Sequence, residues 1–193
     1  MQQATVQLGK LGVQSIVNSM GVFVSAAFAA VNRIDDFAYM PQQNIAHAMT
    51  ALMAQNKGAK KTDRIKAAFR CGMKIELFYG IFIFFVCFFL AHPLMQLFSN
   101  DPVVCKHGVT YLKLISLMYL FPAVTNGVQG YFRGIGDLKI TLISSFVNMS
   151  VRVIFAAVLV FHFSLQIEAL PFSYLAGWIG MLLAEVPLLL RKF

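Results

Sequence analysis

Long apolar runs, separated by short polar or basic stretches, make up most of this chain. A helix that crosses a lipid bilayer needs about 20 mostly apolar residues. The pattern predicts six spans, and all of them should be helices, because lipid offers backbone polar groups no partner outside their own segment. The expected bounds are 1–19, 23–56, 73–97, 108–132, 138–163 and 169–190. We therefore expect an all-α, polytopic membrane protein whose residues 1–193 form a single six-helix transmembrane bundle.

The predicted spans differ in how closely they fit the pattern of a membrane-spanning helix. The first is the poorest, because Lys10 and several glutamines interrupt it, and we interpret it as truncated. The second is longer than a bilayer requires and contains Pro41, which predicts a kink. Residues 60–72, before the third span, are basic and amphipathic. They predict a short surface helix that touches anionic lipid, with a recognition segment as the alternative.

Composition agrees with a membrane protein and also assigns an orientation. The chain is 59% hydrophobic and 12% charged, whereas soluble domains are about 25% charged. The net charge of +8 does not indicate nucleic-acid binding, because the basic residues gather in short clusters between apolar runs. These clusters lie at 57–74, 133–139 and 191–192. The positive-inside rule places them, and the C-terminus, in the cytoplasm of a multi-pass protein of the cell membrane.

Charged and polar residues near the middle of the second span are the strongest functional signal. Counted from Asp36 at about 100° per residue, the polar residues within about 80° of it are Arg33, Tyr39, Gln43, Asn44 and His47. One interpretation is an Arg33–Asp36 pair that only neutralises itself. The other is a stripe that lines a wet cavity, with an aspartate that binds a cation or a proton. The stripe favours Asp36 over Asp35, which lies about 100° away.

Other polar residues fall within the first, fifth and sixth spans. Lys10 is a cavity residue, a partner for Asp35 or Asp36, or a side chain that reaches the membrane surface. Gln14 and Asn18 of the same span are further candidates for the cavity. For Arg152 and Glu185 we expect a structural ion pair between helices, because buried charges are normally paired.

Motifs of soluble enzymes do not occur in the sequence. It contains no P-loop, GxSxG or HExxH pattern and no Cys/His cluster. Cys71, Cys87 and Cys105 have no metal-site spacing. We therefore expect neither an enzyme nor a metal site nor a bound cofactor.

Three segments carry a resemblance to a known family. They are Ala29–Ile34 followed by Ala51–Lys60, with its Gln-Asn-Lys-Gly-Ala turn, then Tyr111–Ser116, and then Asn126–Asp137 with its glycine-rich turn. In order and spacing they resemble the MATE (multidrug and toxic compound extrusion) transporters, which share a superfamily with lipid-linked oligosaccharide flippases. The resemblance covers nearly the whole chain.

The resemblance implies a fold and an activity. Members have twelve helices in two six-helix lobes and export cationic or amphipathic drugs by antiport with sodium ions or protons. The stretches Gln14–Gly21 and Leu175–Gly180 look like the seventh and twelfth helices, which implies the C-terminal lobe. Some members place acidic cation ligands in the seventh and tenth helices, whereas the matching stretches here, 1–19 and 108–132, contain no acid. This departure leaves Asp35 and Asp36 as the mid-membrane acids near the cavity.

Several functions remain open from the sequence. The first is half of a drug exporter, which needs an opposing lobe or a second chain, because alternating access works between two lobes. The second is a lobe of a lipid or oligosaccharide flippase, for which we expect a more basic cavity than this stripe of mixed sign. The third is a non-transporting remnant or interaction protein of the membrane. We favour a fragment of an exporter, and the coding sequence upstream of Met1 tests that choice.

Overall fold

Every regular element between residues 2 and 192, the range that the computed structural model describes, is an α-helix. Side chains are described for residues 6–192. The helices are α1 (Gln2–Ser19), α2 (Val22–Gly58), α3 (Thr62–Phe89), α4 (Ala91–Gln96), α5 (Pro102–Ser116), α6 (Leu120–Gly134), α7 (Leu138–Phe161) and α8 (Ala169–Leu190). The all-helical class expected from the apolar runs is confirmed.

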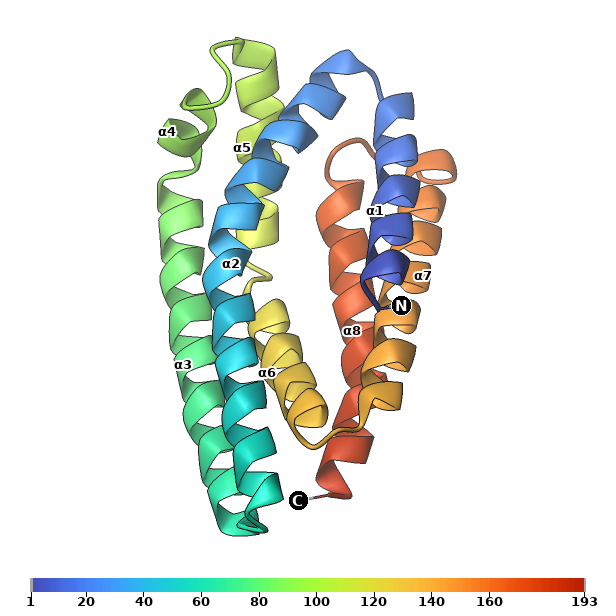
Figure 1. Ribbon diagram of the computed structural model, residues 1–193. Coiled ribbons are helices and arrows are strands. Elements are labelled where there is room, and N and C mark those ends of the chain that lie inside the picture. Colours follow the sequence, from blue (N-terminus) through green and yellow to red (C-terminus); the bar gives the residue numbers. More distant parts are fainter. Residues whose placement is uncertain (1, 193) are drawn as a thin grey trace.

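The helices form two groups that both run along the long axis of the molecule (Figure 1). Helices α2, α3, α5 and α6 pack on one another and make up what we call the four-helix wall, and the short α4 packs on α5. Helices α1, α7 and α8 make up the three-helix wall. The turn from α1 to α2 joins the walls at one end, and the turn from α6 to α7 joins them at the other (Figure 1).

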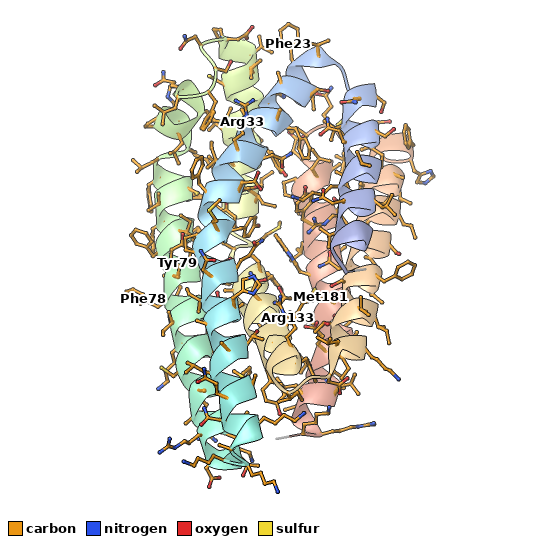
Figure 2. The ribbon with its side chains drawn as sticks, viewed as in Figure 1. Phe23, Arg33, Phe78, Tyr79, Arg133 and Met181 are labelled. Atoms are coloured by element: carbon orange, nitrogen blue, oxygen red, sulfur yellow. The ribbon has the colours of Figure 1, made fainter. Side chains whose placement is uncertain are left out.

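The outer surface is apolar, as a lipid-facing surface must be. Helices α3, α7 and α8 are each long and apolar enough to cross a membrane, and α5 with α6 passes the same test as one bent span. Four phenylalanines follow one exposed stripe of α3: Phe78, Phe82, Phe85 and Phe89. In Figure 2, Phe78 points away from the bundle. A helix that hides few of its large apolar side chains inside the protein needs lipid to cover the rest.

The expected fourth span, 108–132, is not one helix. The chain breaks between Ser116 and Leu120, and α5 meets α6 at an angle of 52°. Pro122 in the first turn of α6 has no amide hydrogen for the carbonyl four residues earlier, and the first turn of a helix is the place where this loss costs least. Instead, the Tyr119 amide donates a hydrogen bond to the Ser116 carbonyl, and the Phe121 amide donates one to the Met118 carbonyl.

The basic stretch 60–72 is likewise not a separate surface helix, because α3 runs without interruption from Thr62. Its first turns pack on α2, with Gly72 against Met49. Helix α2 continues through Pro41 and changes direction near its middle, as the kink prediction requires (Figure 1). Its 37 residues span about 55 Å, well beyond the roughly 30 Å apolar core of a bilayer. The basic turn between α2 and α3 therefore projects past the apolar zone.

All three basic segments lie at one end of the molecule. The α2–α3 turn, the α6–α7 turn and the C-terminal end of α8 meet there (Figure 1). Lys57 donates a hydrogen bond to the Ile135 carbonyl, and Lys192 forms a salt bridge with Asp137. The bonds hold the three segments together, which is the arrangement that a common side of the membrane requires.

Candidate functional site: a polar cleft between two walls

A cleft of about 770 Å³ lies between the four-helix wall and the three-helix wall. Residues of α1, α2, α6, α7 and α8 line it. In Figure 2, Arg133 from α6 and Met181 from α8 lie in the space between the two walls. The lining mixes charged and amide groups with the aromatic rings of Phe28, Tyr39, Tyr174 and Trp178.

Helix α2 contributes most of the residues that the polar stripe singled out. Those in the cleft lining are Asp35, Asp36, Tyr39, Gln43 and His47. Arg33 and Asn44 are exposed and lie outside it. The stripe is rotated from the one expected: relative to Asp36, the cleft face runs from about −100° at Asp35 to about +40° at Met40. Arg33 and Asn44, at about +60° and +80°, therefore face away from it.

Helix α1 contributes Lys10 and Gln14 to the cleft, as proposed from the sequence. Asn18, the third candidate on this helix, lies outside the lining, one turn closer to the end of α1. It accepts a hydrogen bond from the Gln14 side-chain amide at 2.8 Å. Asn18 therefore orients a cleft residue and does not itself reach the cleft.

The two neighbouring aspartates of α2 have different environments. Asp36 is exposed to the cleft, and no salt bridge joins it to Arg33 within the described range. Asp35 is 4% exposed and accepts a hydrogen bond from the Tyr119 hydroxyl at 2.5 Å. Tyr119 lies in the break between α5 and α6, and the Tyr39 ring packs edge-on against it at 5.5 Å. Asp35 therefore ties α2 to the break, while Asp36 is left open to a ligand.

The ion pair expected between Arg152 and Glu185 does not form, since the single salt bridge among the described side chains joins Lys192 and Asp137. The Arg152 guanidinium lies over the Tyr174 ring at 3.7 Å, with the Trp178 ring at 5.7 Å. Glu185 instead accepts a hydrogen bond from the Ser144 hydroxyl at 2.5 Å. Arg152 follows Ser144 by eight residues on α7, which places it about 12 Å further along the axis.

The sequence reasoning missed the contribution of α6 and α7. Their cleft-lining polar residues are Thr125, Asn126, Gln129, Arg133, Ser145, Asn148 and Arg152. The Gln129 side-chain amide donates to the Ser145 hydroxyl at 3.2 Å, which joins the two helices. A signal was present, because these residues recur every three or four positions in otherwise apolar segments, the spacing of one helix face.

Opposite charges face each other across the cleft. Asp35 of the four-helix wall is within electrostatic range of Lys10 and Arg152 of the three-helix wall. Arg133, which lines the cleft from α6, has the same relation to Glu185 of α8, which lies outside the cleft lining. None of these contacts is a salt bridge in the described part of the chain. The arrangement suits a ligand that brings its own charge together with an aromatic body.

Known proteins show where this architecture recurs. Residues 1–158 match the MatE family. The chain is 25% identical to a probable multidrug resistance protein NorM of Thermotoga maritima, an alignment that covers 89% of this chain and 36% of that protein. It is 27% identical to the probable multidrug resistance protein YoeA of Bacillus subtilis over 91% of this chain and 36% of the relative. A FAD transporter of Shewanella oneidensis is 26% identical over 61% of this chain.

Solved structures show the same fold. An outward-facing multidrug resistance MATE transporter superposes with a TM-score of 0.92 at 12% identity, over 99% of this chain and 43% of that one. A transporter of the MOP superfamily from Pyrococcus furiosus superposes with a TM-score of 0.90, again over 43% of its length. The chain thus spans about a third of the curated relatives, 36%, and corresponds to one lobe. It is a multi-pass membrane protein and belongs to the MatE family of transporters.

Proposed function

We propose that this chain is the C-terminal lobe of a secondary-active exporter of amphipathic drugs, driven by proton or sodium entry. The cleft carries the proposal, because it presents charges that are not engaged in salt bridges, together with aromatic rings, on one lobe's face. Alternating access requires a second lobe to close over such a face. In this proposal the basic end of the bundle is cytoplasmic, and Asp36 takes the coupling cation.

The test uses the transporter that contains both lobes, expressed in drug-sensitive cells, with ethidium as the probe. We expect the two-lobe protein to lower ethidium accumulation and expect a collapsed proton or sodium gradient to abolish the effect. The lobe alone, at equal membrane abundance, should leave accumulation unchanged. Equal export by the lobe alone would refute the requirement for a second lobe. Failure of the two-lobe protein to export would refute drug export.

An anionic substrate is a second candidate, and the charge of the cleft favours it. Three basic side chains, Lys10, Arg133 and Arg152, line the cleft beside two acidic ones. One relative is a transporter of FAD, a molecule that carries phosphates. Competition separates the candidates: a phosphate-bearing amphiphile that blocks ethidium export only when Arg152 is present supports an anion subsite. No competition at any concentration would exclude it.

A further inference from the structure

Glu76 of α3 is a fully buried acid that does not line the cleft. The described acids buried in the protein are Asp35, Glu76 and Glu185. The other two each accept a hydrogen bond from a hydroxyl, Tyr119 in one case and Ser144 in the other. Neither oxygen of Glu76 has a partner among the described residues, although its exposed fraction is 0%. Its role is therefore not explained by the cleft.

The packing of three helices locates Glu76 in a seam behind the cleft. A Cβ atom on Gly80 would lie 3.2 Å from the Ala123 Cβ of α6, and Met73 lies against Gly127 of the same helix. Glu76 falls between these two contacts in sequence, so its level matches the middle of α6. Helices α2 and α6 each pack on α3 as well as on one another. We call this region, where α2, α3 and α6 meet, the α2–α3–α6 seam.

Gln42 of α2 lies at the same level. The contact of Met49 with Gly72 sets the register of the antiparallel α2–α3 hairpin, and it places Gln42 opposite the turn of α3 that follows Glu76. Gln42 is also 0% exposed, and both polar atoms of its side chain lack a hydrogen-bond partner among the described residues. Two fully buried polar side chains with unmet hydrogen-bonding groups therefore lie within one layer of the seam.

No charged side chain among the described residues pairs with Glu76. The titratable groups on the surrounding helices include Lys74 and Tyr79 of α3, Tyr39 and His47 of α2, Tyr111 of α5, and Tyr119 and Tyr131 of α6, together with Arg33, Asp35, Asp36, Arg70 and Arg133. None of them forms a hydrogen bond or salt bridge with its carboxyl group. Lys74 and His47 are exposed, and the Tyr119 hydroxyl is engaged by Asp35. An ionised carboxylate is unstable in such surroundings, whereas a protonated one can donate to the Gln42 carbonyl and accept from its amide.

We propose that Glu76 is a proton-binding residue in the α2–α3–α6 seam, outside the cleft, and that the bound proton holds α3 against α2 and α6. Gln43 and Asn126, which flank the seam on α2 and α6, both line the cleft. The seam is thus one helix layer from the aqueous side. The proton site is inferred from the packing of the seam alone, whereas its use in coupling transport rests on the proposed function.

Infrared titration of the purified chain in lipid vesicles tests the site directly. The wild-type protein should show the carbonyl band of a protonated carboxylic acid at neutral pH, with a shift in deuterated water and reversible loss at alkaline pH. Glu76→Gln should remove this band, whereas Asp35→Asn and Glu185→Gln should leave it. An unchanged band in Glu76→Gln, or a carboxylate at Glu76 at neutral pH, would overturn the proposal.

A second variant keeps the test decisive if Glu76→Gln does not fold. In the Asp35→Asn/Glu185→Gln double variant, Glu76 is the single buried acid within the described residues. We expect the band to persist there and to titrate. We also expect the wild-type melting temperature to fall over the pH range in which the band is lost, because ionisation destabilises the folded seam. The readout needs no transport, so failure of drug export and failure of the proton site remain distinguishable.

Discussion

The two walls of the cleft are built differently. In the four-helix wall, α2 bends near its middle, and α5 meets α6 at 52°. A carboxylate–tyrosine hydrogen bond joins the two irregular regions. In the three-helix wall, α7 and α8 each run without a break, and Arg152 is held by the aromatic rings of α8. The wall with bent helices thus presents both cleft acids together with Arg133, whereas the three-helix wall presents Lys10 and Arg152 opposite the acids. Charges fixed on separate walls stay available to a ligand, and a movement of either wall changes their separation.

Neutralising the open acid of the four-helix wall should have the largest effect. In the two-lobe transporter, we expect Asp36→Asn to abolish drug resistance, because a neutral amide cannot take up the coupling cation. Resistance of cells to ethidium measures the change, and immunoblots of membranes check that the abundance of the protein is unaltered. Exposed Arg33, which lies outside the cleft, offers a matched control as Arg33→Gln. Normal resistance in Asp36→Asn would exclude this residue as the cation site.

Close packing within the four-helix wall gives the second prediction. A Cβ atom on Gly130 would lie 2.9 Å from the Ala46 carbonyl oxygen of α2. We expect Gly130→Ala to lower the free energy of unfolding by about 1–3 kcal/mol, because the backbones must move apart. Gly180→Ala in the three-helix wall is the control, since its new methyl group would meet valine side chains at 3.5 Å. Thermal unfolding in detergent gives both values, and equal losses would contradict the difference in packing.

Loss of the hydrogen bond at the break should have a smaller effect. Tyr119→Phe removes the donor to buried Asp35 while keeping the ring. We expect a loss of about 1 kcal/mol in the free energy of unfolding, the typical net contribution of one intramolecular hydrogen bond. Tyr79→Phe, at a half-buried tyrosine of α3 that is labelled in Figure 2, serves as the comparison. A melting temperature of Tyr119→Phe no lower than that of the comparison would show that the bond does not stabilise the break.

The smallest effect is expected for the coupling between Arg152 and Glu185, for which the sequence predicted an ion pair. Because Arg152 and Glu185 have separate partners, the stability losses of Arg152→Leu and Glu185→Leu should add in the double variant, within about 0.5 kcal/mol. Denaturant unfolding of the four proteins measures the coupling. Partial recovery of stability in the double variant would restore the ion pair and remove Arg152 from the list of charges available to a ligand.

The class of fold was predictable because the apolar runs are long and their periodicity simple. The location of the break at Leu117–Tyr119 was not, because the residues around Pro122 are as apolar as the spans on either side. The angular positions that the sequence predicted for the polar residues around α2 were correct. Which side of α2 faces the cleft, however, depends on the helices that pack around it. This packing includes Asp35 in the cleft lining and leaves Arg33 outside it. Arg152 has Tyr174 beside it through the packing of α7 on α8, which no spacing within one helix reveals.

The hydrogen bond between Tyr119 and Asp35 also has a mechanical consequence. Helix α6 has 15 residues, which make an arm of about 22 Å below the break. A change of about 10° in the bend would sweep the far end of this arm, near Arg133, through about 4 Å at that length. The Tyr119 hydroxyl, at the break, therefore restrains a displacement several times larger than any it undergoes itself. A small rearrangement at the break would move the basic end of the molecule.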